Sequence, residues 1–363
     1  MNKTKVFFLL YSMSVGGVEK SLLGLLSTLD PEKYDIHVGL LRRQGDFLPM
    51  LPEHVTVHEC FQGVWNVVNQ PPQVTAKSLL GRGRIGEAAA LLFCHAVYKI
   101  TGDRTLFYKY VLRNEPSINI DFDEAYAYAG PSSMLDFYIC RKVKARRRFG
   151  WIHFDIAKNG IDEVMSRRFY REYEKIYIVS EQAKHNFDLV FPQFADKTEV
   201  RYNIVSAADV RRLAAEGPTF GDGFRGVRIL TVGRLSAEKG QDVTVEALGM
   251  LVSRGHDVKW YYVGYGKLQE VCLKLAGERG VAERVEFLGK QINPYGYMRD
   301  CDIYVQPSRH EGYCITLAEA RCFTAPIVAT DFTGAREQLA AYPRSVVTGM
   351  SAEELAEGIE RFL

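Results

Sequence analysis

Short apolar runs that end in glycine or polar residues alternate with helical stretches along this chain. In the C-terminal half, the apolar runs 229–232, 260–263 and 285–289 are separated by 246–252 and 268–278, in which apolar residues recur every three or four positions. Strands and helices that alternate in this way favour a parallel sheet with helices on both faces. The sequence therefore predicts an α/β fold.

The N-terminal half repeats this order. An apolar run at 5–11 precedes a turn at Gly16 and Gly17, and leucines recur through 21–29 as in a helix. Two lysines before an apolar run are also found in signal peptides, but this run is short and Glu19-Lys20 follows in place of a small-residue cleavage site. A strand, a glycine turn and a helix are therefore expected.

Length and composition narrow the class of protein. A chain of 363 residues exceeds what one core usually supports, so two domains are expected. The segment 207–228 is rich in small, glycine and charged residues, as in an exposed linker, which places the boundary near 206. The net charge of +2 argues against a general preference for nucleic acid. Seven cysteines without C-x-x-C spacing fit a reducing cytosol and provide no zinc site.

One segment combines two carboxylates with a predicted helix start. Glu311 lies in a glycine-containing turn after the apolar run 303–305, and Glu319 follows eight residues later in a helix. Free backbone N–H groups at a helix start bind anions. One carboxylate can then face a sugar while the other faces a ribose.

This segment resembles the donor site of the retaining glycosyltransferases of family 4, whose signature is E-G-[FY]-G-x-x-x-x-E-A after a strand and P-S. Residues 306–313 and Glu319-Ala320 match it, and Cys314 stands where the second glycine usually lies. The segment 229–240 is similar to the G-R-x-x-x-x-K-G element of the same family. Two fixed cations there stabilise a departing diphosphate without a metal ion, whereas a solvated strand-end loop is the alternative.

A third match, Trp151 to Asp155, resembles the W-x-H-x-D element of members that build bacterial surface polysaccharides. In those enzymes the histidine faces the donor sugar, which implies that role for His153. A buried structural histidine is the alternative. Asp155 could equally cap a helix, and turn geometry could equally explain the glycines of 264–266.

The resemblance implies a GT-B architecture of two Rossmann-like domains facing a cleft, with 1–206 binding the acceptor and 207–363 the donor. It implies a cytoplasmic enzyme that moves a sugar with retention, from a UDP- or GDP-sugar to a hydroxyl of a glycan or lipid-linked acceptor in surface polysaccharide synthesis. No cofactor or metal is expected. A sugar-nucleotide epimerase, or a non-catalytic sugar-nucleotide-binding subunit, is the alternative.

The resemblance also implies roles for single residues. Arg234 and Lys239 would hold the diphosphate, Glu311 the donor-sugar hydroxyls and Glu319 the ribose, while backbone N–H groups of 313–316 would bind phosphate. The implied catalytic residues are Arg234, Lys239, Glu311 and His153. The implied donor-binding residues are Gly16, Gly17, Gly233, Gly264, Gly266, Gly312, Tyr313, Cys314, Ile315, Thr316, Glu319 and Gly334.

Two further regions carry expectations. Residues 77–115 contain seven Lys or Arg against three Asp or Glu, interleaved with aromatic residues. Such helices can lie on the anionic inner face of the cell membrane. The interpretation favoured here is that they are amphipathic helices that cover the N-terminal sheet. Family members commonly continue with a helix that crosses back onto the first domain, whereas 351–363 provide about one capped helix. Either the sequence is truncated or the coupling between domains is weak, and a mobile cleft is expected.

Overall fold

The computed structural model describes residues 3–61 and 70–363, and the chain divides into two compact units. The N-terminal unit comprises the residues up to 179 together with 184–202, and the C-terminal unit comprises 180–183 and 203–363. The sequence prediction places the boundary four residues later, after 206.

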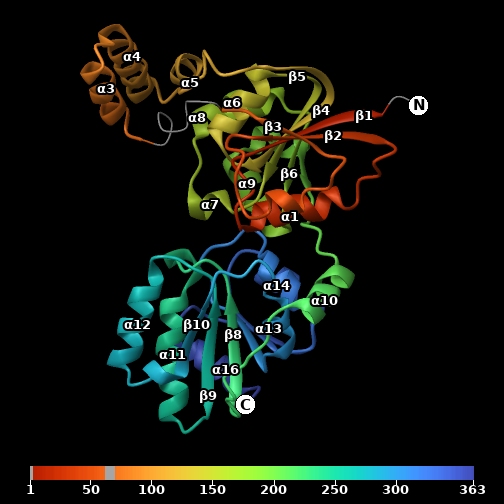
Figure 1. Ribbon diagram of the computed structural model, residues 1–363, viewed down its shortest axis with the longest axis vertical. Helices are drawn as coiled ribbons and strands as arrows, with labels where there is room; N and C mark the ends of the chain where they lie inside the picture. Colours follow the sequence, from red (N-terminus) through yellow and green to blue (C-terminus); the bar gives the residue numbers. More distant parts are fainter. Residues whose placement is uncertain (1–2, 62–69) are drawn as a thin grey trace. The chain divides into compact units, whose positions relative to one another are not determined.

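The N-terminal unit contains a parallel sheet with the strand order β3-β2-β1-β4-β5-β6-β7 (Figure 1). The order reverses between β1 and β4, which is the arrangement of a doubly wound sheet. The strands are β1 Thr4–Leu10, β2 Tyr34–Leu40, β3 Thr56–Glu59, β4 Ile118–Gly130, β5 Val143–Ile152, β6 Lys175–Ile178 and β7 Thr198–Val200.

Helices connect these strands. Helix α1 begins at Gly17, four residues before the predicted start, because the extended Gly16 (φ −167°) already serves as its N-cap. The α-helices are α1 Gly17–Leu26, α3 Pro72–Gly81, α4 Ile85–Thr101, α5 Thr105–Val111, α6 Ser133–Lys142, α7 Ile156–Asn159, α8 Glu163–Phe169 and α9 Glu181–Val190; the short 3₁₀ turns are η1 Leu48–Met50, η2 Tyr170–Glu172 and η3 Pro192–Lys197.

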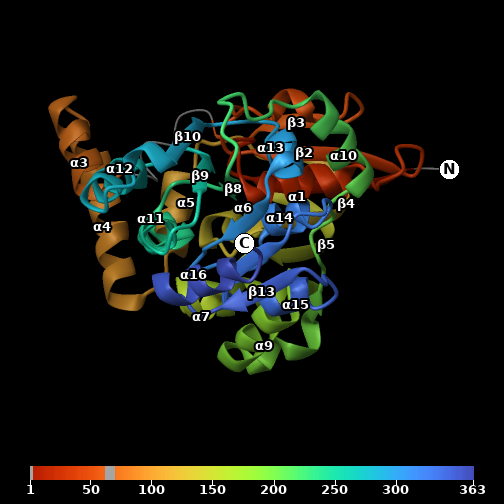
Figure 2. The same ribbon diagram turned by 90° about the horizontal axis from the view of Figure 1, so that it is seen from below.

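The helices near 77–115 do not cover the sheet as predicted. Helices α3 and α4 pack mainly against each other, α4 packs on α5, and α5 reaches α6. Both ribbon views place the α3–α4 pair beside the sheet rather than over it (Figures 1 and 2). The prediction fails because apolar residues at helical spacing identify a helix face but do not identify what that face contacts.

The C-terminal unit contains a second parallel sheet with the order β10-β9-β8-β11-β12-β13. In chain order this is 3-2-1-4-5-6, the order of a Rossmann fold. Alternate side chains enter opposite cores: Leu230, Tyr261 and Tyr304 pack on one face, and Ile229, Trp260 and Ile303 on the other. The strands are β8 Val227–Val232, β9 Val258–Val263, β10 Val285–Gly289, β11 Ile303–Gln306, β12 Ile327–Thr330 and β13 Ser345–Thr348.

The helices of this unit agree with the sequence at α11, α12 and the capped C-terminal helix α16, in which Ser351 and Glu354 form a capping box. The α-helices are α10 Ala207–Glu216, α11 Gln241–Ser253, α12 Leu268–Glu278, α13 Tyr295–Asp300, α14 Ile315–Ala320, α15 Ala335–Leu339 and α16 Ala352–Glu360; the 3₁₀ turns are η4 Ala237–Lys239 and η5 Ala282–Arg284.

The prediction of an exposed linker over 207–228 is wrong for its first ten residues, which form α10. The Ser206 hydroxyl accepts a hydrogen bond from the Asp209 N–H and caps the helix. Val210 and Ala214, four residues apart, are buried on one face of α10. Alanine and arginine are good helix formers, so a composition typical of linkers was also compatible with a packed helix.

Among the described residues, no helix combines the length and the apolar character needed to cross a bilayer.

Candidate active site

The two motifs of the C-terminal half meet where the strand order of their sheet reverses. Arg234 and Lys239 follow β8, Glu311 follows β11, and these two strands are neighbours in the sheet. In open α/β sheets, ligands bind beyond the carboxyl ends of the strands at this reversal. The topology therefore brings the predicted cations and the first predicted carboxylate to one place.

Lys239 and Glu311 form a direct ion pair. The Lys239 ammonium lies 2.5 Å from Glu311 Oε1, and the two side chains are 19% and 10% exposed. Burial is the largest single effect and would lower the pKa of Lys239. The charge of Glu311, a contribution from Cys314 and the hydrogen bond to Glu311 together outweigh it, so the pKa lies above its usual value. Lys239 is therefore a fixed, permanently charged cation at neutral pH.

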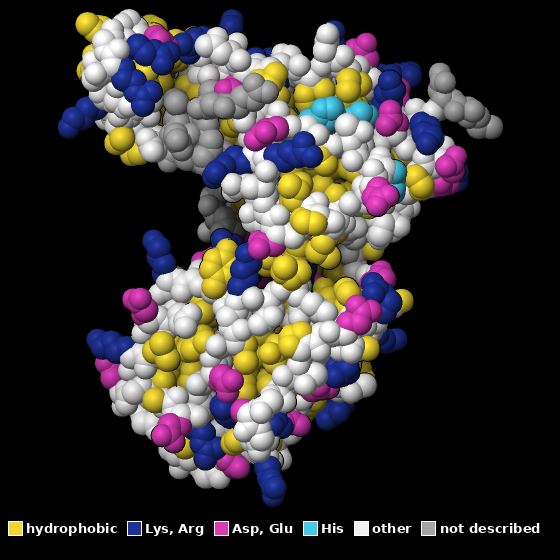
Figure 3. Space-filling model, in the orientation of Figure 1, with side chains coloured by type: hydrophobic (Ala, Val, Ile, Leu, Met, Phe, Trp, Pro, Cys, Tyr) yellow, Lys and Arg dark blue, Asp and Glu magenta, His cyan; other side chains and the backbone are white. Residues whose placement is uncertain are grey.

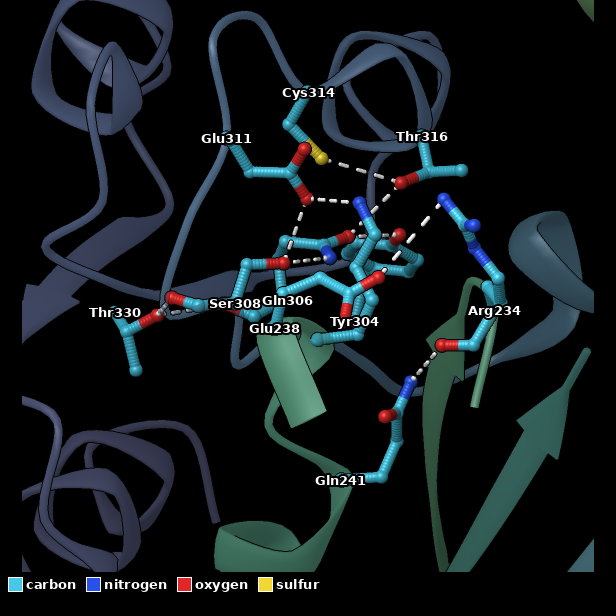
Figure 4. A network of polar contacts seen from close by, with 11 residues as sticks. Arg234, Glu238, Gln241, Tyr304, Gln306, Ser308, Glu311, Cys314, Thr316 and Thr330 are labelled. Carbon is cyan, nitrogen blue, oxygen red and sulfur yellow. Dashed lines mark hydrogen bonds and ion pairs between the residues drawn. The ribbon is translucent and has the colours of Figure 1, made fainter. Parts of the chain in front are cut away.

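A chain of side chains holds Glu311 in place (Figure 4). Ser308 Oγ donates to Glu311 Oε1 at 2.7 Å, and Gln306 Nε2 donates to Ser308 Oγ at 2.9 Å. The hydroxyls of Tyr304 and Thr316 both donate to Gln306 Oε1, at 2.8 and 3.0 Å. The sequence reasoning did not identify Gln306 and Ser308 as positioning residues, although a glutamine that ends an apolar strand was the available signal.

Arg234 differs from Lys239 because its side chain is 68% exposed and lies 3.9 Å from the Glu238 carboxylate. Its backbone carbonyl accepts a hydrogen bond from Gln241 Nε2 at 2.9 Å, which fixes the loop (Figure 4). The neighbouring Gly233 leaves open space, since a Cβ placed there would meet only Lys239 Cδ, at 4.0 Å. The guanidinium is thus available to an anion that lies next to Lys239.

Glu319 is buried in α14, at 2% exposure. The Tyr295 hydroxyl of α13 donates to Glu319 Oε1 at 2.6 Å. Burial, and then the charge of Glu319, raise the pKa of Tyr295, so its proton stays in this hydrogen bond. Sequence reasoning missed Tyr295, which lies 24 residues away in the chain.

The predicted phosphate-binding segment 313–316 is partly occupied by protein contacts. In the orientation that satisfies its amide, Gln338 accepts from the Cys314 N–H at 3.0 Å and donates to the Cys314 carbonyl at 3.1 Å. Burial raises the pKa of the Cys314 thiol to about 12, so the thiol is protonated at neutral pH. Its sulfur lies 3.3 Å from Thr316 Oγ1, and Ile315 begins the six-residue α14.

The other predicted donor-binding glycines of the C-terminal unit contact neighbouring segments of the protein. Gly264 and Gly266 adopt φ of +151° and +152°, and a Cβ on them would lie 1.9 and 2.1 Å from carbonyl oxygens of the β8 loop. Close approach of the two loops therefore requires glycine at both positions. Gly334 (φ +83°) donates its N–H to Gln182 Oε1, and the carbonyl of Gly312 accepts from Ser180 Oγ at 2.9 Å.

The other candidates belong to the N-terminal unit and gather around Tyr128. Gly16 and Gly17 begin α1, whose Ser21 hydroxyl hydrogen-bonds to the Tyr128 hydroxyl at 2.6 Å. The His153 ring centroid lies 4.9 Å from that of Tyr128. Burial lowers the pKa of His153 to about 3, so its imidazole is neutral, and its Nε2 has no hydrogen-bond partner among the described residues.

Asp155 has the structural role that the sequence left open. Its Oδ1 accepts from the Ala157 N–H at 2.9 Å and caps α7, and its Oδ2 accepts from Asn186 at 2.8 Å. No group of three His, Cys, Asp or Glu side chains within 3–61 and 70–363 is arranged to hold a metal ion.

Acidification is expected to destabilise the protein through His153. Because the folded pKa of about 3 lies below the ordinary value of 6.5, the unfolded chain gains a proton that the native site does not gain as the pH falls below 6.5. The free energy of unfolding should then decrease by up to about 1.4 kcal/mol per pH unit. Urea unfolding of the wild type and His153→Gln between pH 7 and 4.5 measures this slope.

The variant should have a shallower slope than the wild type, and replacing the exposed His54 with glutamine serves as the control. Equal slopes in the wild type and His153→Gln would show that the imidazole is accessible to protons in solution.

Comparisons with known proteins agree with this geometry. Residues 225–363 match the family model described as glycosyl transferases group 1. The N-acetylgalactosamine-N,N'-diacetylbacillosaminyl-diphospho-undecaprenol 4-alpha-N-acetylgalactosaminyltransferase of Campylobacter jejuni is 31% identical over 169 residues, which cover 46% of this chain and 44% of that protein. The lipopolysaccharide core biosynthesis mannosyltransferase LpsB of Rhizobium meliloti is 32% identical over 128 residues, covering 33% of this chain and 34% of LpsB. The chain thus spans less than half the length of these curated relatives.

Solved structures match nearly the whole chain. HepE of Anabaena in complex with UDP has a TM-score of 0.67 at 20% identity, covering 99% of this chain and 89% of HepE. TarM of S. aureus, in a complex that includes UDP, has a TM-score of 0.67 at 11% identity, covering 99% of this chain and 92% of TarM. The chain therefore has the GT-B fold of two Rossmann-like α/β domains, and its residues 225–363 match the glycosyl transferases group 1 family.

Proposed function

We propose that this protein is a retaining glycosyltransferase that moves a sugar from a nucleotide-diphosphate sugar to a hydroxyl of a glycan or lipid-linked acceptor in bacterial surface polysaccharide synthesis. The observation that carries this proposal is the Lys239–Glu311 ion pair beside the exposed Arg234, where the order of the Rossmann sheet reverses. The pair supplies a cation for a diphosphate and a carboxylate that can accept hydrogen bonds from sugar hydroxyls.

The comparisons support the substrate class. HepE structures hold UDP and UDP-glucose, which favours a UDP-sugar, with a GDP-sugar as the other donor to test. The names of the two curated relatives specify a diphospho-undecaprenol acceptor and lipopolysaccharide core synthesis. Both point to a surface polysaccharide and an acceptor carried on a lipid or glycan.

In the proposed reaction, the bond from the anomeric carbon to the diphosphate oxygen breaks, and a bond to the acceptor oxygen forms on the same face of the sugar. The acceptor proton passes to the departing diphosphate. Lys239 and Arg234 stabilise the charge that accumulates there, so the proposal needs no metal ion. Glu311 would orient the sugar, Glu319 the ribose, and the neutral His153 would contact the sugar as a hydrogen-bond partner.

A nucleotide sugar that binds this site should stabilise the protein. A ligand at a hundred times its dissociation constant adds about 2.7 kcal/mol to the free energy of unfolding, which a thermal-shift screen of UDP- and GDP-sugars detects. The free sugar and the free nucleoside serve as controls, since each makes only part of the contacts. If no nucleotide sugar raises the melting temperature, the donor site is assigned wrongly.

Transfer itself is tested by incubating a stabilising donor with lipid-linked glycan acceptors. The proposed transferase should release nucleoside diphosphate only in the presence of an acceptor, with the α-configuration of an α-linked donor kept in the product. Release without an acceptor would indicate an epimerase, and binding without any release would indicate a non-catalytic subunit.

A further inference from the structure

Helix α4 exposes a face that is almost entirely apolar. Phe93 and Ile100 are 64% and 86% exposed. Positions that recur every three or four residues share one face of a helix, and the exposed positions on this face are Ile85, Gly86, Ala89, Leu92, Phe93, Ala96, Lys99 and Ile100. Lys99 is the single charged side chain among them.

Apolar residues on the opposite side of α4 are already packed. Ala88, Leu91 and Cys94 are buried in the cluster that α4 forms with α3 and α5. A contiguous exposed apolar patch marks an interaction surface. The exposed face of α4 therefore needs an occupant other than water.

The segment that carries this face is positively charged. Residues 72–111, the docking segment, contain six Lys or Arg and two Asp or Glu, an excess of four in a chain whose net charge is only +2. Both carboxylates are already used: Glu87 pairs with Arg84 and Arg113, and Asp103 pairs with Arg168. Figure 3 shows dark blue side chains gathered on the α3–α4 lobe beside apolar ones.

Arg84 and Arg104 of the docking segment pair with Glu87 and Asp162, and the segment's other four cations have no such partner among the described residues. Lys77, Arg82, Lys99 and Lys109 are exposed, and none forms an ion pair with a carboxylate of residues 3–61 or 70–363. An anionic surface attracts such cations. A second copy of this chain would instead bring the same positive segment against itself, which costs energy through like-charge repulsion.

We infer that the docking segment binds the surface of an anionic lipid bilayer, with the exposed face of α4 inserted among the acyl chains and the cations on the headgroups. Helix α4 has 17 residues and is about 25 Å long at 1.5 Å per residue, shorter than a spanning helix. A helix with an apolar face and flanking cations lies in the interfacial plane. This inference rests on the docking segment alone and not on the proposed transferase activity.

Vesicle co-sedimentation of the full chain tests the inference without any sugar substrate. The protein should sediment with phosphatidylcholine vesicles that contain phosphatidylglycerol, and not with phosphatidylcholine alone. The double variant Phe93→Ser/Ile100→Ser should bind at least about tenfold more weakly, since it removes two large apolar side chains from the inserted face. The matched control is Leu189→Ser on α9, whose side chain is 69% exposed and lies outside the segment.

The contribution of the cations to vesicle binding is measured with a second double variant. Lys77→Gln/Lys99→Gln should weaken binding by about fivefold per cation, and raising the salt concentration should weaken binding of the wild type more than that of this variant. All substituted side chains are exposed, so the melting temperatures should match that of the wild type.

Three results would overturn the inference. The first is that the protein does not sediment with anionic vesicles. The second is that it sediments equally with neutral and anionic vesicles, and the third is that both double variants bind anionic vesicles as well as the wild type does. Light scattering without vesicles adds one more: a dimer that Phe93→Ser/Ile100→Ser dissociates would show that the α4 face joins two copies of the chain.

Discussion

Replacing Lys239 with alanine is expected to lower turnover with a nucleotide-sugar donor by about ten- to a hundredfold, while the affinity for the nucleoside changes little. The lost contact is a charge-assisted hydrogen bond, worth about 1.5–3 kcal/mol, and its partner gains negative charge as the glycosidic bond breaks. Steady-state kinetics with a saturating acceptor, together with nucleoside titration, separates the two quantities.

The Lys239–Glu311 pair complicates a simple alanine substitution. Removing Lys239 leaves the Glu311 carboxylate, only 10% exposed, without its cation, and such a stranded charge destabilises a protein. The double variant Lys239→Ala/Glu311→Gln removes this charge, and its comparison with Glu311→Gln alone isolates the chemical effect of Lys239. Lys267→Ala, in the same unit but at the start of α12, is the matched control for the loss of a surface cation.

Arg234→Ala gives a cleaner test of the same chemistry, because the Arg234 side chain is 68% exposed and lies 3.9 Å from Glu238, its one carboxylate partner in the described part of the chain. Stability should be nearly unchanged while turnover falls within the same range. Unchanged turnover in both the Arg234 and the Lys239 variants would remove the basis for a diphosphate site between β8 and β11.

The second large effect is expected at Glu319. Glu319→Gln keeps the size of the side chain but loses its charge, so affinity for a nucleoside diphosphate should fall by about ten- to a hundredfold if the carboxylate accepts hydrogen bonds from the ribose. A 2′,3′-dideoxy nucleotide should bind the wild type and the variant almost equally, because it lacks the hydroxyls concerned. Isothermal titration with both ligands forms a thermodynamic cycle.

Tyr295→Phe refines this test. The Tyr295 hydroxyl donates to Glu319 Oε1 at 2.6 Å, so its removal takes this hydrogen bond from the carboxylate and leaves the carboxylate itself in the site. Affinity for the ribose-bearing ligand should fall less than in Glu319→Gln, again without effect on the dideoxy ligand. Equal weakening of both ligands by Glu319→Gln would mean that Glu319 supports α14 rather than the ribose.

Local patterns in the sequence were sufficient for most of the fold. The runs 285–289 and 268–278 became β10 and α12 with the predicted bounds, and α11 contains the predicted helical stretch 246–252. A strand needs alternating or continuous apolar residues and a helix needs apolar spacing of three to four, so each pattern is encoded within a few neighbouring residues. The same patterns placed the charged motifs after strands.

Local patterns were insufficient where the same composition fits two structures and only packing decides between them. The segment 207–216 contains small and charged residues, yet it forms α10 because Val210 and Ala214 find an apolar surface. Helix α4 shows the converse, since its apolar residues predicted a buried face and two of them, Phe93 and Ile100, lie exposed.

The sequence by itself determined the two doubly wound sheets and the residue types of the candidate site, because these depend on short-range periodicity and on motifs. Only the tertiary structure decided how those residues are held. The Lys239–Glu311 pair joins residues 72 apart in the chain, Tyr295 reaches Glu319 from another helix, and Gln338 occupies the N–H of Cys314. Such contacts depend on strand order and loop approach in space, which no local pattern of residues specifies.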